Sequence, residues 1–408
     1  MDFTAEEIIF WAAVLLLVSI FGSKAAGKVG IPAILLFLLV GMLTGSDGPG
    51  GIPFDDPWVV QFLGVISLIY ILFSGAFNTK KENIAPVFWS GVTLSTLGVL
   101  LTAVIVAIIT SQIFHISLLG SLLLGSIISA TDAAAVFSIL RSRRMGLKRN
   151  LRPLLEFESG SNDPMSVILS VGIIEMITSP GLSWHRLIGS FFQQMLIGVL
   201  VGYAMGRLMV YVVNKVELEY EGLYPVLIMG LILFAYGAAF FTNGSGFLAV
   251  YIAGLIMGNN VIRHREILSN FYEGIAWLLQ IVMFIVFGLQ VFPSQLPPII
   301  WAGILIAVIT IFIARPIAVY LSLLFSKMSF KEKTMVSWVG LRGATPIILA
   351  TFPILENVPK ADIMFNVVFI TVIASIVIQA PFIPLVAKWL GVDTHLHESA
   401  HSGETSHD

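Results

Sequence analysis

Apolar runs long enough to cross a lipid bilayer recur along the whole chain and constrain its fold more than any other feature. A membrane-spanning helix needs about 17–25 mostly apolar residues, and runs such as VFWSGVTLSTLGVLLTAVIVAIIT and IMFNVVFITVIASIVIQAPFIPLVA recur between short polar loops. Only 11% of the 408 residues are charged, against about 25% in soluble domains. Because too few polar side chains remain to cover a soluble fold, we predict an all-α polytopic membrane protein.

The same composition excludes several other classes of protein. Disordered chains, coiled coils and nucleic-acid-binding proteins need more charge or a basic excess, whereas the net charge here is −2. A transmembrane β-barrel would show alternating rather than continuous apolar residues. The absence of cysteine excludes disulfides and thiolate metal sites. Acidic residues precede the first apolar run, where a signal peptide is basic, so we expect that run to be a retained helix.

Turn residues and charges divide the chain into about thirteen helices. Their approximate ranges are 6–22, 31–45, 58–77, 86–110, 116–140, 154–178, 187–213, 223–241, 246–258, 272–292, 299–325, 334–354 and 362–388. With the N-terminus outside, the cytoplasmic side receives 18 Lys and Arg residues and the external side only Arg186 and Lys360. This positive-inside bias predicts a plasma (inner) membrane protein whose C-terminus is cytoplasmic.

Five ionisable residues lie inside predicted helices and carry most of the functional signal. Each charge would cost about 2.5–3.5 kcal/mol at the centre of a lipid-facing helix, so the five must face one another or water. Most of them lie about 12–15 Å from the internal helix ends, near the middle of the bilayer. The five are Asp132, Glu158, Asp163, Arg315 and Arg342.

Two of the predicted helices contain stretches that suit a regular helix poorly. In 116–140 the sequence SIISATDAAAV brings together side chains that compete for backbone hydrogen bonds. In 334–354 the sequence VGLRGATPIILATFP surrounds Arg342 with glycines and a proline, Pro346. Unwound backbone survives at membrane depth only where it lines a cavity or is buried in protein. We therefore expect two inverted six-helix repeats with interrupted fifth and twelfth helices, a pattern of secondary transporters.

Helix 154–178 supplies oxygen ligands and a carboxyl group for ion exchange. Ser159 and Asp163 are four residues apart and share one helix face. Together with Asp132 and the carbonyl or hydroxyl of Thr131, they could bind a hard monovalent cation, which prefers several oxygens. A carboxylate can hold either a cation or a proton, and this competition is the simplest basis for exchange.

Three motifs resemble the monovalent cation/proton antiporters of the NhaP and Na+/H+ exchanger group. They are ATDAAAVF, FESGSNDP and GLRGATPIILATFP, and the resemblance extends from Asp2 to about Leu390. Its form is most similar to the bacterial potassium/proton, cell-volume-regulation branch. The resemblance implies that Asp163 is the exchange carboxylate, with Asn162 beside it. An Asn-Asp pair implies electroneutral exchange.

The resemblance also assigns roles to the other polar residues and to whole segments. Thr131 and Asp132 form the unwound partner, Ser159 is a cation ligand, and Glu158 pairs with Arg315. The membrane domain then covers 1–390, with a mobile core of about 86–178 and 299–388. A scaffold of about 6–77 and 187–292 mediates homodimerisation, and 391–408 form a short cytoplasmic tail.

Two positions depart from the family pattern. The usual Thr-Asp-Pro is Thr131-Asp132-Ala133 here, so the unwinding must have another cause. Many relatives carry an acid near the end of the third helix, where this chain has Ser74, and we expect Ser74 to pack rather than to bind the ion. We expect Glu156, near a helix end, to be solvated.

Several alternatives stay open at this stage. Arg342 is either a tether for unwound carbonyls or a direct participant in transport. The tail histidines either belong to a disordered segment or act in pH sensing or metal binding; they are His395, His397, His401 and His407. The choice between Na+ and K+ is open.

The sequence as a whole indicates a secondary antiporter rather than an enzyme. We expect a cation and protons as substrates, membrane lipid as surroundings, no cofactor and no nucleic-acid partner. An ion channel would need a selectivity filter, and no such motif is evident. An intramembrane aspartyl protease could use Asp132 and Asp163 as a dyad, but the chain lacks that class's Gly-x-Gly-Asp signature.

Overall fold

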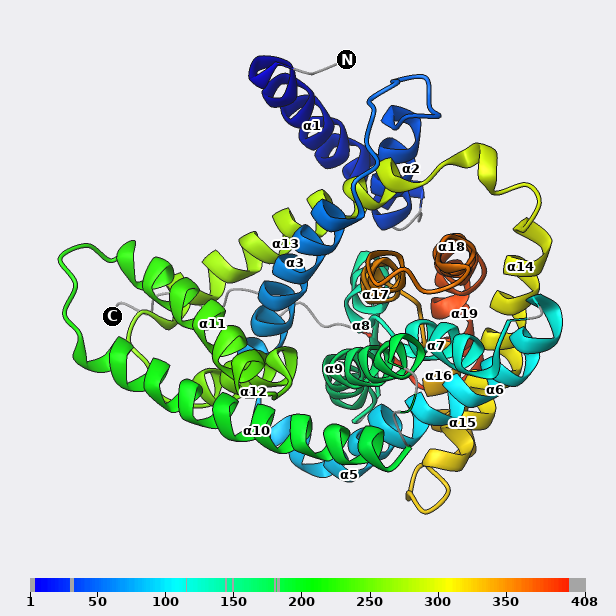
Figure 1. The fold of residues 1–408 in the computed structure, drawn as a ribbon. Coiled ribbons are helices and arrows are strands. Elements are labelled where there is room, and N and C mark those ends of the chain that lie inside the picture. Colours follow the sequence, from blue (N-terminus) through cyan, green and yellow to red (C-terminus); the bar gives the residue numbers. More distant parts are fainter. Residues whose placement is uncertain are drawn as a thin grey trace.

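The computed structural model describes residues 4–29, 33–114, 116–143, 145–148, 150–179, 181 and 184–395, and helices dominate these ranges (Figure 1). The first nine helices are α1 (Ala5–Val29), α2 (Ala33–Thr44), α3 (Pro57–Asn78), α4 (Lys81–Ile84), α5 (Phe88–Thr93), α6 (Val99–Phe114), α7 (Leu118–Ser129), α8 (Ala133–Ser142) and α9 (Leu151–Thr178). The others are α10 (Trp184–Lys215), α11 (Leu223–Phe241), α12 (Gly246–Gly258), α13 (Arg265–Gln290), α14 (Ile300–Ile309), α15 (Arg315–Ser322), α16 (Phe330–Trp338), α17 (Ala344–Leu355), α18 (Ala361–Gln379) and α19 (Ile383–Leu390).

Seven helical stretches in the described ranges are long and apolar enough to cross a membrane. They are 57–78, 81–114, 184–215, 223–241, 265–290, 300–322 and 361–390. Five shorter apolar helices accompany them, among them α2, α7, α12 and α17. The long helix α9 is in neither group, because polar residues interrupt its apolar sequence. The chain is therefore a multi-pass membrane protein.

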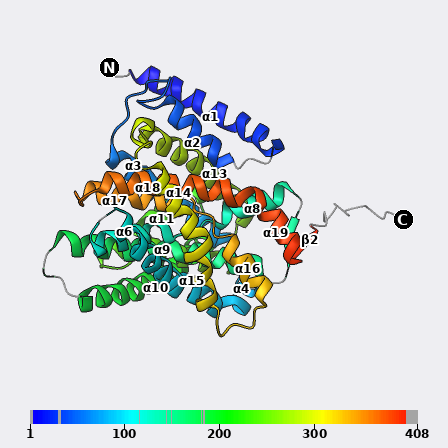
Figure 2. The same ribbon diagram turned by 90° about the vertical axis from the view of Figure 1, so that its right-hand side faces the viewer.

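The helices pack in two groups (Figure 1). In one group α3, α12 and α13 pack together, with α2 against α13 and with α10 and α11 against α12. In the other group α7 packs against α6 and α9, while α18 packs against α14 and α17. The groups meet where α17 contacts α3 and where α9 contacts α10 and α12. A turned view shows α1 and α2 at one end of the molecule (Figure 2).

The two interruptions predicted from the sequence are present. Residues 130–132 separate α7 from α8, and residues 339–343 separate α16 from α17. Pro346 lies in the first turn of α17. A proline clashes with the helix one turn before it, which matches the position of the second break.

Other irregularities were not predicted. The range 86–110 contains a π-helical turn, Leu94–Gly98, and the range 299–325 contains another, Thr310–Ala314, directly before Arg315. A π-helical turn adds a residue to a helix and changes the direction in which the following side chains point. The range 362–388 bends at a 3₁₀ turn, Ala380–Phe382, which contains Pro381. The helix expected over 272–292 begins at Arg265, whose side chain donates to the Gly258 carbonyl (2.6 Å).

The all-α prediction misses one small sheet. Strand β1 (Met145–Leu147) pairs antiparallel with β2 (Asp393–His395), with Gly146 opposite Thr394. Pairing between segments so distant in sequence leaves no local pattern to read. The first residues of the predicted tail thus form β2, whereas His397, His401 and His407 lie outside the described residues.

Candidate functional site

The two unwound segments hydrogen-bond to each other. The Asp132 N–H donates to the Leu341 carbonyl (2.8 Å). The Arg342 Nη1 donates to the carbonyls of Ser129 (2.9 Å) and Ala130 (3.1 Å), the last carbonyls before the first break. Buried backbone groups need such partners. Arg342 therefore acts as the tether that the sequence suggested as one of its two roles.

The first break is stabilised by Asp132 itself. This accounts for a break next to Ala133, where no proline interrupts the helix. The Asp132 carboxylate accepts a hydrogen bond from the Ala135 N–H (3.2 Å), the geometry of an N-cap at the start of α8. A cap of this kind satisfies a backbone donor that the helix leaves open. Asp132 thus begins a new helix without a proline at position 133.

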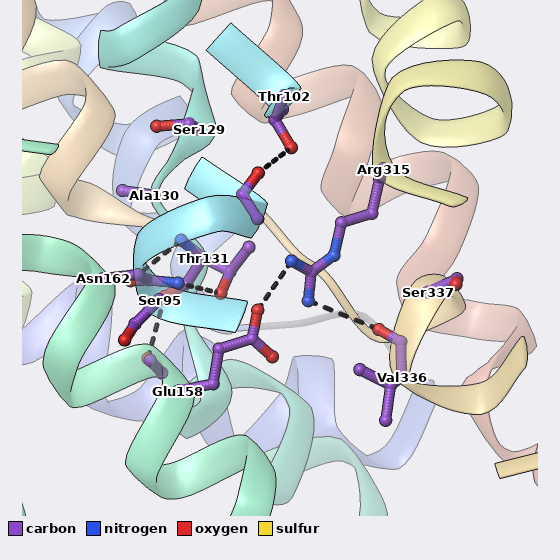
Figure 3. Close-up of polar contacts among 12 residues, drawn as sticks. Ser95, Thr102, Ser129, Ala130, Thr131, Glu158, Asn162, Arg315, Val336 and Ser337 are labelled. Carbon is purple, nitrogen blue, oxygen red and sulfur yellow. Dashed lines mark hydrogen bonds and ion pairs between the residues drawn. The ribbon is translucent and has the colours of Figure 1, made fainter. Parts of the chain in front are cut away.

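Helix α9 also contacts the first unwound segment, with Asn162 lying beside Thr131 (Figure 3). The Asn162 Nδ2 donates to Thr131 Oγ1 (2.6 Å), and Asn162 Oδ1 accepts a long hydrogen bond from the Thr131 N–H (3.4 Å). Ser159 Oγ donates to the Thr131 carbonyl (2.8 Å). In this geometry Asn162 fixes the position of Thr131 with both ends of its amide.

A cavity of about 670 Å³ brings most of the predicted site residues together. Thr131, Asp132, Ser159 and Asp163 line it, whereas Asn162 is buried behind the wall. Both helix groups contribute to the wall, since residues of α3, α12 and α13 face those of α8, α9 and α17. Charged and polar residues of helix ends also line it: Asn78, Lys80, Arg152, Glu156 and Glu273.

The Asp163 carboxylate is buried and incompletely satisfied. The residue is only 8% exposed, and among the described residues its Oδ1 has no hydrogen-bond partner. Asp132 interacts with it electrostatically, and the Thr345 hydroxyl faces it from the start of α17. Two negative charges in one cavity repel each other, so a proton or a cation placed there would be stabilised by both carboxylates.

A buried ion pair lies beside this arrangement and does not line the cavity. Glu158 Oε1 and Arg315 Nη1 are 2.6 Å apart, and the side chains are 1% and 3% exposed (Figure 3). Arg315 also donates weakly to the Val336 carbonyl (3.4 Å). A Cβ atom at Gly340 would lie 2.6 Å from Arg315 Nε, so the second unwound segment packs directly on Arg315. The pair links α9, α15 and that segment.

Comparison with known families and structures gives this geometry a context. The family profile described as "Sodium/hydrogen exchanger, transmembrane" matches residues 12–389. The chain belongs to the sodium/hydrogen exchanger family.

Individual relatives agree with this assignment. A K(+)/H(+) antiporter NhaP of Alkalimonas amylolytica is 42% identical over 381 residues, which cover 93% of this chain and 66% of that protein. The chain thus spans about two thirds of the length of that relative. The Na(+)/H(+) antiporter 1 of Methanocaldococcus jannaschii is 28% identical over 90% of this chain and 92% of that protein. The structure of the sodium proton antiporter MjNhaP1 from the same organism matches with a TM-score of 0.83 and 25% identity, covering 94% of this chain and 98% of that one.

Three further residues lie at the site in this family member. Ser74, which we expected to pack rather than to bind the ion, is buried and contributes to the cavity wall, and that expectation stays a prediction. Glu156, which we expected to be solvated, is partly exposed, lines the cavity and pairs with Arg152 (2.9 Å). Thr345 was not among the site residues expected from the sequence, yet it faces Asp163. The first turn after a break is where such a hydroxyl can be sought, because its side chain lies beside the unwound backbone.

Proposed function

We propose that the protein is a secondary antiporter that exchanges a monovalent cation, K+ or Na+, for protons at the cavity between Asp132 and Asp163. One observation carries the proposal: two carboxylates line a cavity to which both helix groups contribute. Asp132 lies at the break between α7 and α8, and Asp163 lies in the neighbouring helix α9. Antiport is also what the names of the similar proteins state for those proteins. None of those names describes an enzyme.

The cation site that we propose is built from oxygen atoms. Asp163, Asp132 and Ser159 supply side-chain oxygens, and Thr131 supplies its carbonyl oxygen. Asn162 belongs to the site as the residue that holds Thr131 in place. Asn162 is neutral and has no proton to exchange, so Asp163 is the residue of this pair that exchanges a proton for a monovalent cation. We therefore propose an electroneutral stoichiometry.

Access to this site alternates in our proposal. The core of about 86–178 and 299–388 moves against a scaffold of about 6–77 and 187–292, with thirteen spans arranged as two inverted six-helix repeats. The scaffold also forms a homodimer. In the plasma (inner) membrane, with the N-terminus outside and the C-terminus inside, the charged helix ends that line the cavity lie on the cytoplasmic side. The structure then corresponds to the inward-facing state.

Replacing Asp163 tests the proposal most directly. In proteoliposomes that contain an imposed pH gradient, addition of K+, Na+ or Li+ should dissipate the gradient with the native chain. Asp163→Asn removes the charge that holds the cation and should abolish this proton movement. Asp362→Asn, at an exposed position in the first turn of α18, is the matched control. Exchange that survives in Asp163→Asn would overturn the assignment.

Competition at one carboxylate predicts a specific pH dependence. As pH rises, fewer protons compete for the site, so the half-saturating cation concentration should fall while the maximal rate stays constant. Initial rates measured over a series of cation concentrations at several pH values check this. A voltage clamp with K+ and valinomycin distinguishes electroneutral from electrogenic exchange, because only an electrogenic rate responds to the clamp.

A further inference from the structure

Two polar side chains of α18 form hydrogen bonds with the backbone at both ends of the second unwound segment. They approach it from the side opposite the cavity. Gln379 Nε2 donates to the Trp338 carbonyl (2.6 Å), the last carbonyl of α16. The Arg342 N–H, just before α17, donates to Ser375 Oγ (3.1 Å). Ser375 Oγ in turn donates to Gln379 Oε1 (2.6 Å). The two side chains therefore bridge both ends of the break.

Each of these three hydrogen bonds can run in only one direction from donor to acceptor. The Arg342 N–H must donate, so the Ser375 hydroxyl accepts there and uses its own proton toward Gln379. The Gln379 amide then accepts with its oxygen and donates with its nitrogen. Both side chains are fully buried. A helix end in such surroundings leaves backbone groups that cost free energy unless they are paired.

The segment held in this way positions the proposed cation ligands. Leu341 accepts from the Asp132 N–H, and Arg342 donates to the carbonyls of Ser129 and Ala130. A Cβ atom at Gly343 would collide with the Asp132 carboxylate. A displacement of residues 339–343 would therefore move the backbone of residues 129–132, which carries the Thr131 carbonyl.

We infer that Ser375 and Gln379 are positioning residues for cation binding. They touch neither the cavity nor the ion, and they act through the second unwound segment on Thr131 and Asp132. This inference rests on the proposed antiport at that site. The sequence offers one signal for it, since two polar residues four apart in an apolar helix share a face.

The test compares three buried positions on the same helix in proteoliposomes. Ser375→Ala and Gln379→Leu remove the bridge, whereas Thr371→Val is the matched control, because the Thr371 hydroxyl is buried without a hydrogen-bond partner among the described residues. The measurement is the rate of pH-gradient dissipation over a series of K+ and Na+ concentrations, which separates the half-saturating concentration from the maximal rate.

A positioning role predicts a half-saturating concentration about tenfold higher or more in both variants, with Thr371→Val unchanged. The double variant should be no worse than Gln379→Leu, because both residues belong to one chain of hydrogen bonds. A merely structural role would lower the amount of folded protein and the maximal rate, and leave the half-saturating concentration constant. That result would overturn the inference.

Two further controls keep the outcomes separate. If Gln379→Leu fails to yield folded protein by gel filtration, Ser375→Ala, which deletes one hydroxyl, decides the question by the same criterion. If the native chain and Thr371→Val both fail to exchange cations for protons, the proposed antiport itself is wrong. If they exchange and the two bridge variants match them, only the positioning role is wrong.

Discussion

The two unwound segments both interrupt apolar helices and hydrogen-bond to each other, but they differ in what they contribute to the cavity. Residues 130–132 carry oxygen atoms toward the cavity, and α9 holds them through Asn162 and Ser159. Residues 339–343 carry glycines and Arg342, which donates to carbonyls of the first segment. In our proposal the first segment supplies ligands and the second supplies support. A broken helix at the middle of a membrane is therefore no sufficient sign of an ion ligand.

Replacing Arg342 should have the largest effect on this comparison. Arg342→Gln leaves the carbonyls of Ser129 and Ala130 without a charged donor, and hydrogen bonds to charged groups contribute about 1.5–3 kcal/mol each. We expect a lower melting temperature in detergent and a loss of exchange. Arg263→Gln, at an exposed position, is the control. An unchanged melting temperature in Arg342→Gln would show that the second segment does not support the first.

Replacing Asp132 should separate ligand from support. Asp132→Asn keeps a side-chain oxygen that can cap α8, so the melting temperature should change little. It removes one negative charge from the cavity, and we expect the half-saturating cation concentration to rise about tenfold, equivalent to about 1.4 kcal/mol. Thermal unfolding and exchange kinetics on the same preparation check this. A large loss of stability with unchanged cation dependence would reverse the roles of the two segments.

The substitution Gly343→Ala adds one methyl group and should have the smallest effect of the three substitutions. The new Cβ atom would meet the Asp132 carboxylate and push it from its position, so we expect a several-fold rise in the half-saturating cation concentration. Gly237→Ala is matched in size, because no atom lies within 4 Å of a Cβ placed there. Equal kinetics in the two variants would show that the contact between the segments does not set the cation site.

Local sequence was enough to find the buried charges, and also to find the interruptions. Asp163, Asp132 and Arg342 stood out because a charge in an apolar run is costly wherever it faces lipid. Pro346 and the glycines around Arg342 marked the second break. These signals depend on each residue's own chemistry and its near neighbours, which is why they can be read in one dimension.

Other features could not be read in this way. The π-helical turn before Arg315 and the sheet between β1 and β2 have no local signature, because they depend on segments that meet only in the folded chain. The direction of Thr345 toward Asp163 depends on how α17 packs against α9. The spacing of Ser375 and Gln379 places them on one helix face, but their contacts with Arg342 and Trp338 appear only in the folded chain.

The sequence by itself determined that this chain crosses a membrane many times and carries charges that cannot face lipid, because both follow from the free energy of transferring side chains into hydrocarbon. The family resemblance already paired Glu158 with Arg315, but only the tertiary structure decided which partners the other buried polar residues meet. Pairing removes the penalty for a buried polar group, but many pairings satisfy that requirement equally well. The packing of α9, α17 and α18 around the two breaks selects one of them.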